Sequence, residues 1–464
     1  MDKIVRYLIF LFFSFHQIQA QNNKIPVIWA ENDSVTIKEY GYTYRECISK
    51  TKDSLSYGTS DNLNIIKIFS DNSDTIFLKH RNAPFEERFY VKVNSAKGSV
   101  VIKYNFWESR SNLTKEYFNK NCGKVNIELP EAFELANIAY SITKDGLQNR
   151  NKIFHECTYY QEVINYFSSF KEHPLIKKLN ADGNIYSSLR DNSICYEFKN
   201  NKLVVGLYNI VEGKEIKDNY FTQLLPLIQD FADKTKFQDF YKSHESYYQK
   251  LIEEENTQVP IKKMWTWLER EFTNKKDTYK VIFSPLINNS HRTQGFSLIS
   301  NGKFQHEVIM LICGTNRYEN SKLSPKQIEG QLSRILFTEI DHNYINPKTD
   351  RMGKQIIPIF KQNKWIDSTA NDRDGFNYLK TGGAKSVFNE YMTWATFTLY
   401  LHDNFSKEDF DFINKSAEKL MIEGRRFVRF KEFNEKLLDI YLARKEGEKV
   451  TDMYPKILEW ASSQ

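Results

Sequence analysis

Cysteine is scarce in this chain, and its spacing excludes one class of site. The 464 residues contain five cysteines, at positions 47, 122, 157, 195 and 313. No two of them form a C-x-x-C pair, so a zinc site built from thiolates is not expected. The odd count leaves at least one thiol unpaired, and the apolar surroundings of Cys313 (VIMLICG) are typical of a core residue.

Long uncharged apolar runs are also missing. No stretch reaches the roughly 18 residues that a membrane-spanning helix requires, so no membrane span is expected. The short run Leu8–Phe15 follows Lys3 and Arg6 and precedes the small residue Ala20. This order of basic, apolar and small residues predicts a secretory signal peptide over residues 1–20. We therefore expect an exported protein, either periplasmic or secreted.

Three signatures of other function classes are absent. The net charge of +6 is not concentrated in a run of Lys and Arg, so no nucleic-acid partner is expected. The chain has no G-x-S-x-G motif, which disfavours a serine hydrolase. The glycines of DGFNYLKTGG (374–383) lack the spacing and the Lys-Ser/Thr ending of a phosphate-binding loop.

What the chain does contain is apolar material for a large core, in two regions of different periodicity. Apolar residues make up 41% of the chain and aromatic residues 15%. Residues 21–128 form short alternating segments rich in β-branched side chains, which predicts a β-sandwich-like accessory domain. From residue 129 to 464 helical spacing predominates, with apolar strands expected at 279–286 and 304–314. The predicted fold class is α+β, a β-rich module followed by a helix-rich domain with a small sheet.

The segment 325–345 carries the clearest helix signals in the chain. Ser324 is a suitable N-cap, Pro325 fits the first helical position, and Gln327 completes a capping box. We predict that the helix stops near Pro347, because proline and the polar residues after it disfavour continuation.

Two polar residues continue the apolar stripe of this predicted helix. Ile328, Leu332 and Ile335 recur at helical spacing, and the same spacing reaches Glu339 and His342. A carboxylate left charged and unpaired in a core costs several kcal/mol. The pattern therefore predicts a metal, a cation, a proton or a water-filled cleft at this point.

A second predicted helix, 386–402, shows the same anomaly. Glu390 lies on its apolar stripe, which consists of Val387, Trp394, Phe397 and Leu401. If the two helices face each other, Glu339, His342 and Glu390 meet. A helix with E-x-x-H followed by a later helix with Glu is the arrangement that a zinc hydrolase with two histidines and one glutamate would use.

Three segments resemble one known family. FQHEVIMLICG, TEIDHNYINP and FNEYMTW are similar to a family of exported bacterial proteins of unknown function, itself similar to zinc metallopeptidases of the gluzincin type. The resemblance covers roughly Asn126 to the C-terminus. It implies a zincin-like domain acting on a peptide or protein substrate, with Glu339 as catalytic base and His342 and Glu390 as ligands of a divalent metal, zinc first.

Thr338 departs from the family motif H-E-x-x-H, because it stands where the first histidine would be. Three outcomes are open. Glu339 becomes a ligand, which favours a harder metal than zinc. Another residue supplies the missing donor, and the candidates are Asp341, His291 and His306. The third outcome is a site that holds no metal and binds without cutting.

A purely structural interpretation competes with these three. Glu339 would then pair with Arg334, and His342 would cap the helix end. The sequence also offers Tyr344, Tyr378 and Tyr391 as hydrogen-bond donors to an oxyanion. The function predicted is an exported zincin-like peptidase or a degenerate derivative. The alternatives are a non-catalytic pseudo-peptidase that keeps the cleft without metal, and a carbohydrate-binding role for the β-rich module.

Overall fold

The computed structural model describes most of the chain beyond the N-terminus. The described residues are 25–39, 42–50, 54–59, 65–70, 75–79, 87–106, 113–208, 210–211, 214–215, 219–300, 303–361, 364–367, 378 and 383–464. The predicted signal peptide, residues 1–20, lies outside them. The chain divides into two compact units, one ending at Glu108 and one beginning at Ser109. The α+β fold class is confirmed.

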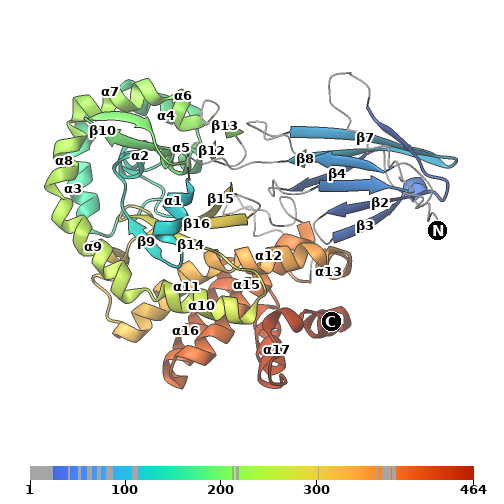
Figure 1. Ribbon diagram of the computed structural model, residues 1–464. Coiled ribbons are helices and arrows are strands. Elements are labelled where there is room, and N and C mark those ends of the chain that lie inside the picture. The colour runs from blue at the N-terminus through green and yellow to red at the C-terminus, as the bar shows by residue number, and fades with distance from the viewer. Residues whose placement is uncertain are drawn as a thin grey trace, which may run out of the picture. The chain divides into compact units, whose positions relative to one another are not determined.

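The first unit contains two four-stranded sheets, ordered β1-β7-β8-β4 and β3-β2-β5-β6 (Figure 1). Its strands are β1 (Val27–Trp29), β2 (Ser34–Glu39), β3 (Tyr42–Cys47), β4 (Ser54–Thr59), β5 (Ile65–Phe69), β6 (Ile76–Lys79), β7 (Glu87–Ser95) and β8 (Gly98–Phe106). A short helix, η1 (Ile48–Lys50), follows β3.

Period-two alternation builds the core of this unit. Val91 of β7 lies opposite Ile102 of β8, and Val93 lies opposite Val100. All four side chains are buried, and they belong to one apolar cluster with residues of β2, such as Ile37. The two sheets therefore share a single core, because the apolar side chains of each sheet lie on the face that contributes to this cluster.

The second unit is built around a mixed sheet ordered β15-β16-β14-β9. β14 (Thr278–Ser284) pairs in parallel with both β16 (Lys303–Cys313) and β9 (Val125–Glu128). β15 (Arg292–Ser300) is antiparallel to β16. Every residue of β14 is buried, including the polar residues Thr278, Lys280 and Ser284, because the strand is paired on both sides.

Two features of this sheet differ from the sequence interpretation. β9 comes from the segment assigned to the β-rich module, so the contact boundary at Glu108 precedes the predicted one at residue 128. Its alternation fits an edge strand of either domain, and only the pairing with β14 decides. β15 lies between the strands expected at 279–286 and 304–314 and was not itself predicted, because Gln294 and Gly295 weaken the strand pattern of its first half.

Helices make up most of the second unit. The α-helices are α1 (Lys115–Asn121), α2 (Glu131–Ser141), α3 (Thr158–Phe167), α4 (Pro174–Asp182), α5 (Tyr186–Ser193), α6 (Tyr220–Gln223), α7 (Leu225–Thr235), α8 (Phe237–Ser243), α9 (Glu245–Gln258), α10 (Ile261–Glu271), α11 (Pro325–Ile340), α12 (His342–Arg351), α13 (Gly353–Phe360), α15 (Gly383–Asn404), α16 (Lys407–Lys419), α17 (Phe430–Leu442) and α18 (Tyr454–Ser463). Single turns are η2 (Ser168–Phe170), η4 (Thr315–Tyr318), η6 (Leu420–Gly424) and η7 (Val450–Asp452), and two hairpins pair β10 (Tyr196–Lys199) with β11 (Lys202–Val205) and β12 (Ile210–Val211) with β13 (Lys214–Glu215).

Helix α11 begins as its sequence predicts. The Ser324 hydroxyl accepts from the Gln327 backbone N–H, and the Gln327 side chain accepts from the Ser324 N–H. The helix packs on β16 and on α15 and α16. A side chain at Gly330 would collide with Ile413 of α16, so glycine is needed for this close approach.

The chain does not leave the helical path at Pro347, and the predicted stop there is wrong. α11 ends at Ile340, α12 runs from His342 to Arg351, and Pro347 lies inside it. Proline has no N–H to donate to the carbonyl four residues earlier, which belongs to Asn343. That carbonyl accepts from the Asn274 side chain at 3.1 Å instead, so the helix continues without an unsatisfied acceptor.

Among the buried glutamates of the second unit, Glu134 and Glu255 have no cationic partner among the residues that the structure describes. Glu134 of α2 accepts from the Tyr159 hydroxyl at 2.7 Å, and burial raises its pKa to about 7. Neither carboxylate oxygen of Glu255 in α9 has a hydrogen-bond partner, and burial raises its pKa to about 8. In neutral solution Glu255 is therefore largely protonated, and Glu134 is protonated in part.

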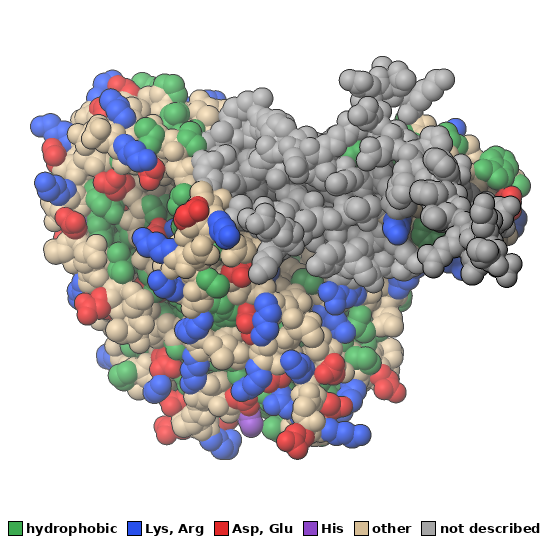
Figure 2. All heavy atoms as spheres, viewed as in Figure 1, with side chains coloured by type: hydrophobic (Ala, Val, Ile, Leu, Met, Phe, Trp, Pro, Cys, Tyr) green, Lys and Arg blue, Asp and Glu red, His purple; other side chains and the backbone are tan. Residues whose placement is uncertain are grey.

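Charge on the surface is mixed. On the face seen in Figure 2, Lys and Arg side chains alternate with Asp and Glu over the helix-rich unit. Among the helices of the described residues, none is both long and apolar enough to cross a membrane. All five cysteines are described, and no disulfide joins any two of them.

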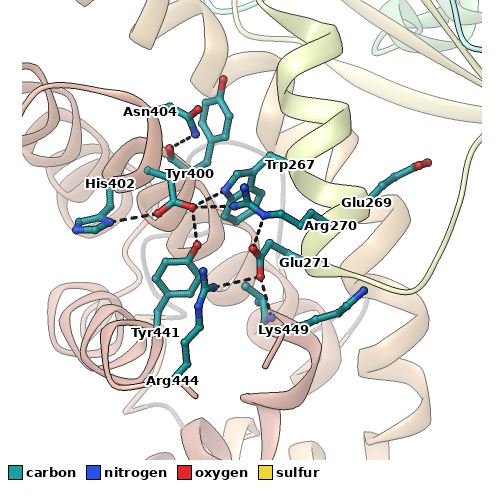
Figure 3. A network of polar contacts seen from close by, with 12 residues as sticks. Trp267, Glu269, Arg270, Glu271, Tyr400, His402, Asn404, Tyr441, Arg444 and Lys449 are labelled. Carbon is teal, nitrogen blue, oxygen red and sulfur yellow. Dashed lines mark hydrogen bonds and ion pairs between the residues drawn. The ribbon is translucent and has the colours of Figure 1, made fainter. Parts of the chain in front are cut away.

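A polar network ties α10, α15 and α17 together (Figure 3). The Asp403 carboxylate accepts from Trp267 Nε1 at 2.9 Å, from Arg270 Nη2 at 2.9 Å and from the Tyr441 hydroxyl at 2.6 Å. Glu271 accepts from Arg270 Nε at 2.9 Å and from Arg444 Nη1 at 3.2 Å. Both carboxylates are thus neutralised by arginine.

Candidate functional site

Two of the three residues predicted to share a site, His342 and Glu390, lie close together, and the charges of both act on the third, Glu339. Glu339 lies in the last turn of α11, His342 is the first residue of α12, and Glu390 belongs to α15. His342 Nε2 is 3.8 Å from Glu390 Oε1, and the His342 and Glu390 side chains are 23% and 13% exposed. The helices bring them together because each residue continues an apolar stripe that faces the other helix.

Glu390 already has a strong partner. Arg425, which follows η6, donates from Nη1 to Glu390 Oε2 at 2.6 Å. The Arg425 guanidinium also lies over the Trp394 ring, 4.9 Å from its centroid. A charge-assisted hydrogen bond of this length is among the stronger polar contacts in proteins.

Thr338 does not face the cluster with its hydroxyl. Its Oγ1 donates to the carbonyl of Arg334, one turn earlier, at 2.9 Å, and the residue is 8% exposed. This back-bonding is the usual way in which a threonine inside a helix satisfies its hydroxyl.

The surroundings of Glu339 favour its protonated, neutral form more than water does. Burial raises its pKa to about 6, and the charge of Glu390 acts in the same direction. His342, Arg425 and Arg190 oppose this increase. A carboxyl with such a pKa exchanges a proton near physiological pH, as a general base or acid must.

Asp341, one of the candidates for a missing donor, lies at the junction of α11 and α12. It is fully buried, and neither of its oxygens makes a regular hydrogen bond. Burial, Glu390 and Glu339 raise its pKa well above the ordinary value. Thr393 and the His342 backbone N–H lie close enough to oppose this shift without forming a regular bond.

The two candidate histidines have other surroundings. His291 Nε2 contacts the carbonyl of Asn288 at 2.9 Å, and burial followed by the charges of Arg317 and Arg190 lowers its pKa to about 3. Burial and the charge of Lys276 lower the pKa of His306 to about 3. No contact of either side chain with His342 or Glu390 is found in the described part of the chain.

Of the three candidate tyrosines, Tyr378 is the one whose charge acts on the Arg425 that pairs with Glu390. The Tyr344 hydroxyl bonds that of Tyr279 at 2.7 Å, and the Tyr391 hydroxyl donates to the Trp365 carbonyl at 2.6 Å, so both serve the core. Tyr378 acts electrostatically on Arg425 and packs against Phe427.

The donor set does not fit a zinc ion. A catalytic zinc needs about three protein ligands. Among the described residues, no group of three His, Cys, Asp or Glu side chains is placed to hold a metal ion. Glu390 is held by Arg425, and the Thr338 hydroxyl is used within its helix. His342 and Glu390 as metal ligands therefore stay a prediction.

Arg425 is the residue that sequence reasoning missed. It lies at the end of η6, next to Arg426 with its positive φ of 63°, in a turn without periodicity. Arg334 was considered as a partner for Glu339, but the charges that act on Glu339 are those of His342, Glu390, Arg425 and Arg190. The one available signal was the unbalanced acid Glu390, which required a cation from elsewhere.

Comparisons of the chain with protein-family models, with curated proteins and with solved structures find no match.

Proposed function

We propose that this protein binds a peptide or protein ligand at a peptidase-like site that works without a metal ion. The observation that carries the proposal is the pair between Arg425 Nη1 and Glu390 Oε2 at 2.6 Å. A guanidinium there supplies the positive charge that a metal would supply to this carboxylate. The ligand class follows from the resemblance of the motif segments to metallopeptidases.

Loss of the metal favours binding over cleavage. In a metallopeptidase the ion polarises the scissile carbonyl and acidifies water, and the glutamate only takes the proton. Glu339 retains a pKa suited to that transfer, but it has no described partner that polarises a carbonyl as an ion does. His342 and Glu339 remain available as hydrogen-bonding groups, because both are only part-buried.

A metal-dependent peptidase is the second candidate. The pKa of Glu339, about 6, supports it together with the approach of His342 Nε2 to within 3.8 Å of Glu390 Oε1. In that case Glu339 is the base and His342 and Glu390 bind the ion.

Metal content separates the two proposals. The purified mature protein is incubated with zinc, desalted and analysed by mass spectrometry. We expect substoichiometric metal in the unmodified protein and in a Thr338→Ala control. The double variant Thr338→His/Arg425→Gln restores the motif histidine and frees Glu390, so it should bind about one zinc per chain.

The controls decide how to interpret a failure. One tightly held metal in the unmodified protein would replace the binding proposal by the peptidase, and Glu339→Gln should then abolish hydrolysis. A double variant that folds but holds no zinc would contradict the peptidase-like geometry of α11 and α15. Arg425→Gln alone tests whether the freed carboxylate is sufficient, and we expect that it is not.

A further inference from the structure

Arg334 of α11 carries a positive charge that no described carboxylate neutralises. The guanidinium groups of Arg190 and Arg425 have acid partners, Asp191 at 2.6 Å and Glu390 at 2.6 Å. Arg334 forms no ion pair in the described part of the chain. Its Nε is buried without a hydrogen-bond partner, and the one polar side chain that acts on the guanidinium by hydrogen bonding, Tyr318, is neutral. Its cation lies over the Trp394 ring, 5.5 Å from the centroid.

Arg317, in η4, is a second cation without an acid partner in the described residues. Its Nη1 donates to the Asn288 carbonyl at 3.2 Å, and its Nη2 donates to the Asn288 side chain at 3.0 Å. These acceptors are neutral, so they fix the position of the guanidinium without cancelling its charge. Arg317 therefore adds to the positive potential felt by its neighbours.

The two unbalanced arginines lie close to each other and to the candidate site. Arg317 and Arg425 both act electrostatically on Arg334. Arg334 and Arg425 contact the same Trp394 ring, at 5.5 and 4.9 Å. Arg425 in turn binds Glu390, which lies 3.8 Å from His342. The positive region is thus continuous with the Glu390–His342 pair.

Such an arrangement is unfavourable without an anion. Bringing part-buried cations together costs Coulomb energy, and an unpaired buried donor costs the free energy of its lost hydration. Arginine forms two parallel hydrogen bonds with a carboxylate, so a single carboxylate would satisfy Arg334 and reduce the repulsion from Arg317. The nearby acids do not do this, because Arg425 holds Glu390 and Asp341 lies in the core.

We propose that Arg334, supported by the charge of Arg317, binds a carboxylate of the ligand beside Glu339 and His342. The proposal rests on the proposed function and specifies its ligand class. The carboxylate is either a peptide C-terminus or an acidic side chain, and both present the same group to the guanidinium.

The test compares three sets of fluorescent N-acetylated pentapeptides in equilibrium binding to the full mature protein. The first set has neutral side chains and a free C-terminus, the second has the same side chains and a C-terminal amide, and the third is amidated and contains one glutamate. We expect the first or third set to bind at least about tenfold more tightly than the second, as a charge-assisted pair provides. Tighter binding of the first set identifies a C-terminal carboxylate, and tighter binding of the third identifies an acidic side chain.

Variants assign the effect to Arg334. Arg334→Gln should lose the preference for a carboxylate and leave the weak binding of the amidated neutral set unchanged. Arg334→Lys should keep part of it, because lysine keeps the charge without the two-pronged geometry. Arg150→Gln is the matched control, since the Arg150 side chain is 67% exposed. Thermal unfolding of each variant shows whether it is folded.

The outcomes separate the subsite from the proposed function. Equal binding of all three peptide sets, unaffected by Arg334→Gln, would overturn the subsite and leave peptide binding intact. No peptide binding, but a rise in melting temperature with succinate that Arg334→Gln abolishes, would support the subsite and overturn peptide binding. No peptide binding and no effect of succinate would overturn the subsite. If Arg334→Gln does not fold, loss of the preference in a folded Arg317→Gln supports the subsite, and an unchanged preference there overturns it.

Discussion

Two polar clusters of the helix-rich unit shift the pKa values of their carboxyl groups in opposite directions. In the network of Figure 3, Asp403 accepts from Trp267, Arg270 and Tyr441. Burial acts to raise the pKa of Asp403, but these hydrogen bonds and the charge of Arg270 outweigh it, and the pKa is lowered. In the motif cluster, burial raises the pKa values of Asp341 and Glu339.

The difference distinguishes a network whose polar groups are paired with one another from a cluster in which some polar groups lack partners. A satisfied network stabilises the contact between helices, and a ligand gains nothing from entering it. A cluster with raised pKa values and an unpaired arginine is less stable by itself, and a ligand can supply the missing partners. The comparison predicts that equivalent substitutions in the two regions have different effects on the free energy of unfolding.

The largest effect is expected for Asp403→Ala. The change leaves the Trp267 N–H and the Tyr441 hydroxyl without this acceptor and removes one of the two acid partners of Arg270. We expect a loss of about 3 kcal/mol in the free energy of unfolding, measured by urea denaturation near pH 7. Arg150→Gln, an exposed arginine substitution, should change it by less than about 0.5 kcal/mol. A loss below about 1 kcal/mol for Asp403→Ala would contradict the conclusion that the Asp403 network stabilises the contact between the helices.

A smaller effect is expected from the pH dependence contributed by Glu255. Its pKa is about 8 in the folded chain, above the ordinary glutamate value. Between these two values the folded state holds a proton that the unfolded state has lost, so stability falls as pH rises. Relative to Glu255→Gln, the unmodified protein should lose about 2 kcal/mol between about pH 5.5 and pH 7. Parallel pH profiles of the two proteins would contradict the unpaired burial of Glu255.

The smallest effect is expected for Asp341→Asn. The surroundings that raise the pKa of Asp341 favour its neutral acid over the carboxylate. An amide of the same shape therefore costs less than about 1 kcal/mol near pH 7. Asp403→Asn is the matched control and should cost more, because it removes a charge that Arg270 uses. Equal losses in the two variants would show that the regions do not differ.

Local sequence patterns were sufficient to predict the start of α11 and the helix positions of the candidate site residues. The capping box at Ser324 and Gln327 depends on residues three apart, and the structure contains it. The stripes of the two helices placed Glu339, His342 and Glu390 on facing surfaces, and His342 and Glu390 lie 3.8 Å apart. The capping box and the positions of Glu339 and Glu390 on their own helices follow from local spacing. The approach of His342 to Glu390 also required α12 to follow α11 directly and to pack on α15.

Non-local partners could not be predicted. Arg425 reaches Glu390 from a turn thirty-five positions away in the chain. The helix passes Pro347 because Asn274, on another element, satisfies the Asn343 carbonyl. β9 joins β14 although its own pattern fits the preceding module equally well. In each case the deciding contact comes from a segment that the local pattern does not include.

The buried acids have a consequence for calorimetry. Near neutral pH the folded chain keeps protons on Glu255 and, in part, on Glu134. Both carboxyl groups ionise once water reaches them, so unfolding releases these protons to the buffer. The heat absorbed in a scanning experiment then includes the protonation enthalpy of the buffer, and it should differ between phosphate and Tris at the same pH.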